Sequence, residues 1–118
     1  MHELSMAMSI LGIVRDEAQK ARASAVTRVR LCVGDLAGVE AATLASCFEM
    51  VREGTIAATA ELTVKRIPAT GTCLLCGATA GRQGRTLRCP KCKTGSVRLA
   101  TGRELYVESI DVEKTQQG

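Results

Sequence analysis

Two pairs of cysteines restrict the fold of this 118-residue chain more than any other feature. Two residues separate the members of each pair, and twelve residues lie between the pairs. Two short turns at this spacing can wrap one tetrahedral ion, and four thiolates select zinc or iron. The spacing therefore favours a metal site over a disulfide or free thiols, on Cys73, Cys76, Cys89 and Cys92.

The predicted metal site has a structural role. All four ligands are protein sulfurs, so the coordination shell is closed and leaves no position for substrate or water. A ribbon with few apolar side chains needs the ~10–16 kcal/mol that zinc binding supplies to folding. Rubredoxin-type iron is a minor alternative, because such sites usually have an aromatic shell and no aromatic residue lies between Cys73 and Cys92.

The residues that follow the two cysteine pairs differ. Gly77 follows Cys76 and supplies the backbone freedom that a metal-binding turn needs. Lys93 holds the matching position after Cys92, so the second turn is predicted to be less favourable. The intervening residues 77–88 are too polar to pack a core and are predicted as a loop.

Hydrophobic periodicity predicts two helices and three strands. The helices are residues 4–22 and 39–53, the second ending before Gly54. The strands alternate over residues 25–33, 58–66 and 104–112, the last with a slip between Val107 and Ile110. The predicted inward side chains of the helices are Leu4, Ala7, Met8, Leu11, Val14, Ala18 and Ala21, then Leu44, Cys47, Phe48 and Val51. Cys32 falls on the polar side of the first strand and is predicted to be accessible.

These elements predict an α+β fold in which a three-stranded sheet carries both helices on one face, plus an inserted zinc ribbon with four cysteine ligands. Residues 1–68 and 103–113 form the α+β domain, residues 69–102 form the ribbon, and residues 114–118 form a polar tail. The strand–helix–strand segment 25–66 crosses over right-handed if its strands are parallel neighbours.

Composition excludes several classes of protein. With 46% apolar and 24% charged residues, the chain is globular. No apolar run approaches the ~20 residues of a membrane span, and the start of the chain lacks the basic region of a signal peptide. A cytoplasmic location is expected, where cysteines bind metals or stay free. No segment pairs a nucleophile with a base, so an enzyme is not expected.

Basic residues gather around the cysteine pairs. From Lys65 to Arg103 there are nine basic residues and no acidic one. Part of this charge neutralises a four-thiolate zinc site, and the remainder suits an acidic protein surface or a nucleic acid. A nucleic acid is the less favoured partner, because the segment has no aromatic residue on which bases could stack.

The chain's single histidine is its second residue. The Met1 amine and the amide and imidazole nitrogens of His2 can close fused chelate rings on Ni(II) or Cu(II). Glu3 can add its amide or carboxylate, although an acid there also complements the dipole of the following helix. A solvated histidine is the commoner outcome for such a residue taken alone, and these residues leave both interpretations open.

With the terminus and the cysteines together, the chain resembles the HypA/HybF family of nickel-delivery proteins for [NiFe]-hydrogenase maturation. The resemblance runs nearly end to end. It rests on residues 1–5 (MHELS) opening a helix, on the loop 34–39 (GDLAGV), on the two cysteine pairs, and on residues 102–105 (GREL) before the last strand.

The resemblance implies a two-site nickel metallochaperone. Nickel would bind Met1, His2 and Glu3, Glu40 would assist, and zinc would bind the four cysteines. The implied partners are the HypB GTPase and the hydrogenase large-subunit precursor, with no membrane, and the oligomeric state is left open between a monomer and a weak homodimer. Some family members carry histidines near the zinc cysteines, and this chain has none. The competing interpretation is a zinc-ribbon module that binds nucleic acid or protein without a nickel role.

Overall fold

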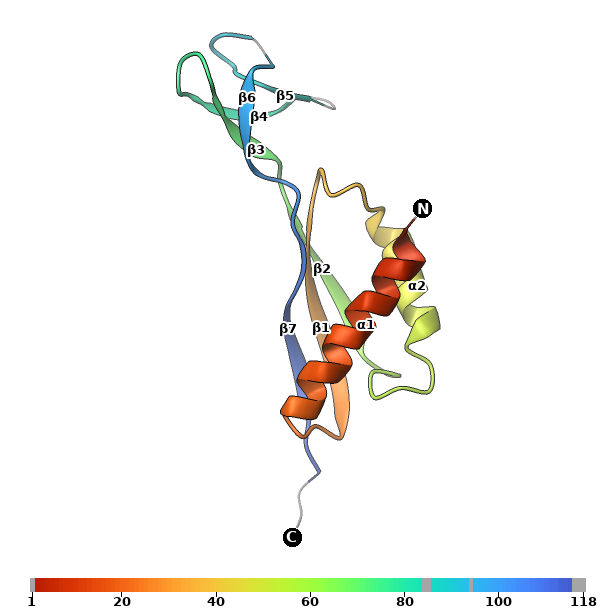
Figure 1. The fold of residues 1–118 in the computed structure, drawn as a ribbon. Coiled ribbons are helices and arrows are strands. Elements are labelled where there is room, and N and C mark those ends of the chain that lie inside the picture. The colour runs from red at the N-terminus through yellow and green to blue at the C-terminus, as the bar shows by residue number, and fades with distance from the viewer. Residues whose placement is uncertain (1, 84–85, 94, 116–118) are drawn as a thin grey trace. The chain divides into compact units, whose positions relative to one another are not determined.

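The computed structural model describes residues 2–83, 86–93 and 95–115, which divide into two compact units (Figure 1). The helical unit comprises Met1–Cys32, Val39–Lys65 and Tyr106–Gly118, and the ribbon unit comprises Val33–Gly38 and Arg66–Leu105. Three features of the sequence predictions lie wholly or partly outside the described residues: the nickel ligand Met1, the basic residue Arg85, and residues 116–118 of the polar tail.

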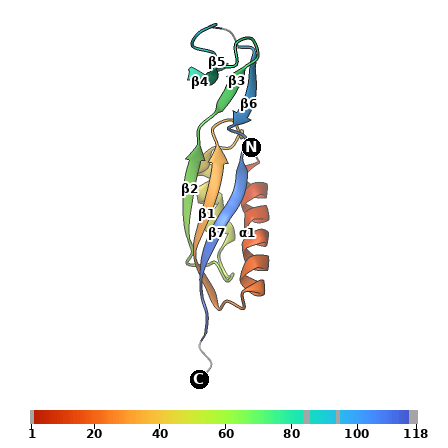
Figure 2. The ribbon, with the colours of Figure 1, turned by 90° about the vertical axis from the view of Figure 1, so that its left-hand side faces the viewer.

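The three-stranded sheet has the order β2-β1-β7. Its strands are β1 (Ala25–Gly34), β2 (Glu61–Ile67) and β7 (Leu105–Glu113). β1 and β2 run parallel, and β7 runs antiparallel to β1 (Figures 1 and 2). The strand–helix–strand segment 25–66 therefore joins parallel neighbouring strands, which is the condition under which a right-handed crossover was predicted.

Both helices, α1 (Glu3–Lys20) and α2 (Ala41–Val51), lie on one face of this sheet (Figures 1 and 2). The α+β prediction is confirmed. The core is aliphatic apart from Phe48 and Cys32, and burying each of its larger apolar side chains stabilises the unit by about 1.5–3 kcal/mol. Neither helix of the described chain has the length and apolar composition needed to cross a membrane. The buried core of the helices and β1 consists of Ala7, Ile10, Leu11, Val14, Ala18, Val26, Val29, Leu31, Cys32, Val33, Leu44 and Phe48.

The buried face of α1 differs from the prediction. Leu4 and Met8 are 48% and 59% exposed, whereas Glu3 is only 8% exposed and Ile10 joins the core. Residues spaced three or four positions along the helix from Glu3, such as Ala7 and Ile10, point inward. Leu4 and Met8 therefore lie beside this buried stripe. The periodicity correctly predicted the burial of Ala7, Leu11, Val14 and Ala18, and it was wrong for Leu4 and Met8.

The two cysteines of the helical unit also differ from the prediction. Cys32 is buried, with 1% of its surface exposed, and its thiol donates a hydrogen bond to the Glu108 carboxylate at 3.3 Å. The Glu108 carboxylate lies 4.0 Å from the Lys65 ammonium group, so longer side chains from both neighbouring strands surround the short thiol. Cys47, predicted to be buried, is half-buried.

The ribbon unit contains a four-stranded sheet of order β5-β4-β3-β6. The prediction of a loop over residues 77–88 was wrong, because β4 and β5 form an antiparallel hairpin there. These short strands are held by backbone hydrogen bonds, which side-chain periodicity does not reveal. The strands are β3 (Thr70–Cys73), β4 (Thr79–Gln83), β5 (Thr86–Arg88) and β6 (Val97–Thr101).

The turn Val33–Gly38 packs within the ribbon unit. The Gly34 N–H donates to the Glu104 carbonyl at 2.7 Å, and the Leu36 N–H donates to the Gly102 carbonyl at 2.6 Å. A Cβ atom on Gly34 would lie 2.1 Å from the Gly102 oxygen, so only glycine permits this approach. Two segments that the sequence singled out separately, the loop at 34–39 and residues 102–105, are thus hydrogen-bonded to each other.

Candidate metal centre

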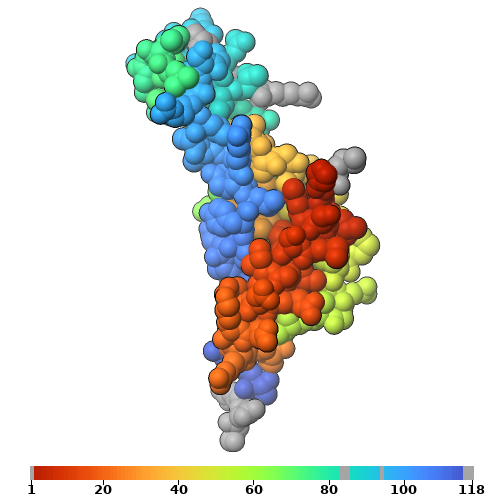
Figure 3. Space-filling view, viewed as in Figure 1, coloured from red at the N-terminus to blue at the C-terminus, as the bar shows by residue number. Residues whose placement is uncertain are grey.

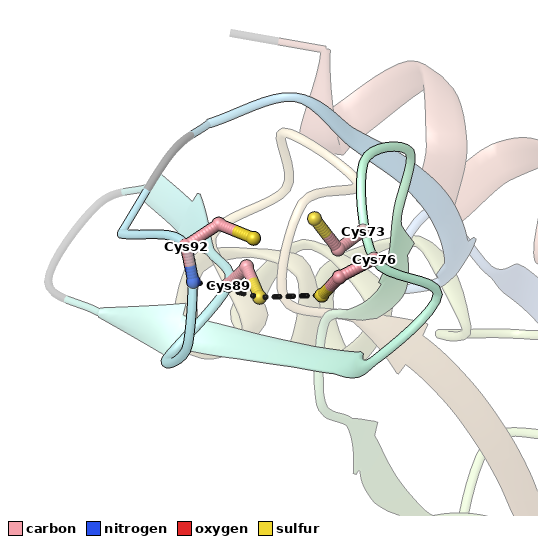
Figure 4. A group of neighbouring side chains, drawn as sticks. All are labelled: Cys73, Cys76, Cys89 and Cys92. Carbon is pink, nitrogen blue, oxygen red and sulfur yellow. Dashed lines mark hydrogen bonds between the residues drawn. The ribbon is translucent and has the colours of Figure 1, made fainter.

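Four thiols from two turns of the ribbon unit converge on one point (Figure 4). The Sγ atoms of Cys73, Cys76, Cys89 and Cys92 all lie within 4.8 Å of one another. Zinc–sulfur bonds of about 2.3 Å in a tetrahedron place the sulfurs about 3.8 Å apart. The observed cluster therefore fits one such ion with little rearrangement, and its donor set is the one that structural zinc prefers.

The two cysteine turns are built alike. The Gly77 N–H donates to the Cys73 carbonyl at 2.9 Å, and the Lys93 N–H donates to the Cys89 carbonyl at 2.8 Å. Within each turn the first sulfur also accepts a backbone N–H at 3.4 Å, from Leu75 onto Cys73 and from Cys92 onto Cys89. Such N–H groups stabilise the negative charge that a thiolate carries when it binds a metal.

Both turns end in the left-handed backbone region. The φ angle of Gly77 is +75° and that of Lys93 is +55°. Glycine adopts this conformation freely, whereas the Cβ atom of lysine makes it costly. The prediction of a less favourable second turn therefore has a conformational basis, and the two turns differ mainly at this residue.

The thiols influence each other's protonation. The N–H of Cys92 lowers the pKa of the Cys89 thiol to about 7, and the N–H of Lys91 acts in the same direction. The hydrogen bond with Cys76 raises the pKa of Cys92 to about 12, and burial adds to the rise. Metal binding to all four sulfurs must displace the remaining protons, so affinity falls on acidification.

At the amino terminus, His2 is exposed and precedes α1 without making a side-chain capping bond. The next residue, Glu3, is buried, and its carboxylate accepts the Glu40 N–H at 3.2 Å. The positive amino terminus and, secondly, this N–H lower the pKa of the Glu3 carboxyl to about 2. Glu3 is therefore a carboxylate at neutral pH.

Glu40 meets Glu3 through its backbone and not through its side chain. The Glu40 carboxylate accepts the Ala42 N–H at 2.8 Å and caps the start of α2. The structure thus joins Glu3 to the main chain of Glu40, whereas the Glu40 carboxylate makes its contact within α2. Sequence reasoning missed this backbone hydrogen bond, because nothing in the local pattern joins residues 37 positions apart.

Among the described residues, the cysteine cluster is the one group of three or more histidine, cysteine or acidic side chains close enough to hold an ion. A nickel chelate at the amino terminus would use main-chain nitrogen atoms and Met1. A cluster defined by side chains of the described residues alone does not include these atoms. The structure therefore assembles the predicted zinc ligands directly. It describes two of the three predicted nickel ligands, His2 and Glu3.

One further polar cluster was not predicted. Asp35 accepts hydrogen bonds from Arg66 at 3.2 and 3.3 Å, and an Arg82 nitrogen lies 3.6 Å from its other oxygen. This acid, 18% exposed, joins the turn Val33–Gly38 to the end of β2 and to β4. The sequence indicates a turn here, because Asp35 lies between Gly34 and Gly38. It does not indicate the two arginine partners, because they come from distant segments of the chain.

Comparison with known proteins extends these observations. A family model described as "Hydrogenase/urease nickel incorporation, metallochaperone, hypA" matches residues 1–112. A hydrogenase maturation factor HypA from Dehalococcoides mccartyi strain 195 is 37% identical over 117 residues, which are 99% of this chain and 98% of that protein. One from Chlorobaculum parvum is 39% identical over 113 residues, covering 96% of this chain and all of that protein.

A solved structure has the same fold. The solution structure of the Ni metallochaperone HypA from Helicobacter pylori matches with a TM-score of 0.69 and 23% identity, covering 98% of this chain and 100% of that one. At this identity the likeness concerns the fold alone. The match of residues 1–112 to the family model, together with relatives above 30% identity, shows the relationship itself: this chain belongs to the HypA family of nickel metallochaperones for hydrogenase maturation.

Proposed function

We propose that this chain binds Ni(II) as cargo at its amino terminus and helps deliver it to the large subunit of [NiFe]-hydrogenase. The observation that carries the proposal is that residues 1–112 match a nickel-incorporation family and that the chain's single histidine, His2, is exposed. The helical unit would carry nickel, and the ribbon unit would carry zinc. We further propose that the protein acts in the cytoplasm, with the HypB GTPase and the large-subunit precursor as partners.

The nickel site would consist of the Met1 amine, the His2 amide and imidazole nitrogens, and Glu3. Nitrogen donors in a plane suit Ni(II), which prefers tetragonal geometry. Glu3 is already ionised at neutral pH and needs to lose no proton in order to take part. Glu40 would assist by holding the Glu3 carboxylate through its N–H, since its own carboxylate caps α2.

The zinc site would consist of Cys73, Cys76, Cys89 and Cys92. A closed shell of four thiolates offers no open position for exchange or catalysis, so the ion would stabilise the ribbon unit. An exposed terminal chelate, by contrast, can load and release its ion. This difference between the two sites is what a protein that transfers nickel and keeps zinc requires.

The test is metal analysis of untagged protein before and after nickel addition. The expected result is one retained zinc and one loadable nickel per chain, and the nickel should be lost in His2→Ala with zinc content unchanged. Ser5→Ala, at an exposed position of α1, is the matched control and should load nickel normally. Full nickel loading by His2→Ala would refute the terminal site.

The alternative is a zinc-ribbon module that binds nucleic acid or protein without handling nickel. The basic segment around the cysteines is the observation in its favour. That function predicts a salt-sensitive complex with DNA or RNA that neither nickel nor His2→Ala alters. A chain that binds nucleic acid tightly and loads no nickel would replace the proposal with this alternative.

A further inference from the structure

The first cysteine turn exposes two large apolar side chains. Leu74 is 58% exposed and Leu75 is 69% exposed. A single exposed leucine needs no explanation, but these two are adjacent and lie between two cysteines of the metal cluster. The hydrogen bonds of the turn and a bound ion would fix their backbone. They would therefore be presented to a partner at little further cost in conformational entropy.

A surface pocket of about 310 Å³ lies beside the first of these leucines, Leu74. Its lining combines the apolar side chain of Leu74 with the cationic side chain of Arg98. β3 and β6 pair antiparallel with Thr72 opposite Arg98, which places the guanidinium group beside the first cysteine turn. In Figure 3 the green first turn and the blue strand β6 form adjoining parts of one surface.

Basic residues accompany both cysteine turns, since Arg98 lines this pocket and two lysines lie in the second turn. Lys91 and Lys93 belong to the second cysteine turn, whose sulfurs lie within 4.8 Å of those of the first turn. Within the described chain, neither lysine forms an ion pair, and neither does Arg98. The helical unit is different, because its sheet pairs such charges, for example Arg30 with Asp111. These three basic side chains of the ribbon thus have no acidic partner among the described residues.

We propose that this surface, the ribbon tip, formed by Leu74, Leu75, Lys91, Lys93 and Arg98, docks an acidic protein segment. The partner would bring an apolar side chain to the leucines and carboxylates to the cations, with one carboxylate on Arg98. Guanidinium groups bind carboxylates in a two-pronged geometry that lysine does not offer. Because the charges are exposed, the complex weakens as salt is raised.

The same features disfavour the other classes of partner. A nucleic acid presents mainly charged phosphates and stacked bases, and the ribbon has no aromatic side chain on which unstacked bases could stack. A membrane surface usually engages aromatic residues or a long amphipathic helix, and the described part of residues 66–103 provides neither. An acidic protein segment satisfies both the charge and the leucines.

The experiment uses the full-length, zinc-loaded protein and a fluorescein-labelled synthetic peptide that alternates glutamate with leucine. Binding is followed by fluorescence anisotropy at low and physiological salt. Two control peptides replace the glutamates by glutamine or the leucines by serine. We expect saturable binding of the first peptide and at least about tenfold weaker binding of each control, because each loses either the charge or the apolar contact.

Protein variants then locate the binding site. Leu74→Ser/Leu75→Ser and, separately, Arg98→Glu should each weaken binding about tenfold or more while zinc content stays unchanged. Met50→Ser and Arg15→Glu make matched changes at exposed positions of the helical unit and should bind normally. His2→Ala should also bind normally, so this test is independent of nickel.

Three results would overturn the proposal. The first is the absence of saturable binding below millimolar peptide. The second is equal binding by the ribbon-tip variants and the controls. The third is preferential binding of anionic phosphatidylserine vesicles or of single-stranded DNA over the acidic peptide, which would assign the surface to that other class. If the leucine double variant loses zinc, Arg98→Glu alone decides, since its side chain is exposed on β6.

Discussion

The two cysteine turns end in the same left-handed backbone conformation but carry different residues there, Gly77 and Lys93. Replacing Lys93 by glycine and Gly77 by alanine should therefore change the stability of the ribbon unit in opposite directions. Lys93 has a φ angle of +55°, which costs a residue with a Cβ atom roughly 1–2 kcal/mol. Glycine would remove that cost but add about 0.4–1 kcal/mol of unfolded-chain entropy. Lys93→Gly should therefore stabilise the unit by about 1 kcal/mol and at most about 1.6 kcal/mol, and Gly77→Ala should destabilise it by a similar amount.

Steric clashes do not contribute to this estimate of stability. No heavy atom lies within 4 Å of a Cβ atom built on Gly77, so an alanine there would meet no steric clash. The whole effect comes from the backbone conformation. Because zinc binding and ribbon folding are coupled, about 1 kcal/mol corresponds to about a fivefold change in zinc affinity. Competition with a zinc chelator at fixed pH measures this change directly.

Matched controls separate backbone strain from charge and flexibility. Lys91 lies in the same turn, and its φ angle is not positive, so Lys91→Gly removes the same charge without relieving strain. It should weaken zinc binding, whereas Lys93→Gly should strengthen it. Gly81→Ala in β4, at a site with open space and no positive φ, is the control for Gly77→Ala. Equal effects of the two lysine variants would refute the reasoning.

Other substitutions test the remaining structural claims. Cys76→Ser should lose zinc and unfold the ribbon unit, and wild-type metal content and melting would contradict the structural role. Gly34→Ala places a Cβ atom 2.1 Å from a backbone oxygen and should cost about 1–3 kcal/mol or more of unfolding free energy in denaturant titrations, while an unchanged midpoint would sink the close-approach argument. Arg30 lowers the pKa of Asp111, so the pair stabilises the sheet above the ordinary aspartate pKa, and this contribution is lost as pH falls below about 4. Hydrogen exchange in β1 should therefore depend on acid less steeply in Arg30→Met, and an unchanged pH profile would show that the pair does not contribute.

The sequence predicted the features that depend on local chemistry. The cysteine spacing identified four ligands that the structure brings within 4.8 Å, because two short turns fix most of that geometry themselves. Helical and strand periodicity found all five elements of the helical unit to within about three residues. The contrast between Gly77 and Lys93 was also readable, since each follows its cysteine pair directly.

The features that sequence reasoning missed depend on contacts between distant segments. In the first turn of α1, Glu3 is buried and accepts the N–H of Glu40, whereas hydrophobicity alone placed Leu4 inside. Cys32 was judged by its place in an alternating strand, but the side chain of Glu108 from β7 lies against it. The ribbon strands have almost no apolar pattern because backbone pairing holds them, so periodicity could not find them.

The hydrogen bonds between the turn Val33–Gly38 and the residues around Gly102 limit which fragments of this protein can keep the structure of the ribbon unit. A fragment running from Arg66 to Leu105 would keep all four thiols but would lose the N–H of Leu36 that the Gly102 carbonyl accepts. It would also leave Arg66 and Arg82 without the carboxylate of Asp35. Anyone transplanting the ribbon into another scaffold must therefore carry two pieces of chain, one taken from ahead of α2 and one from behind it.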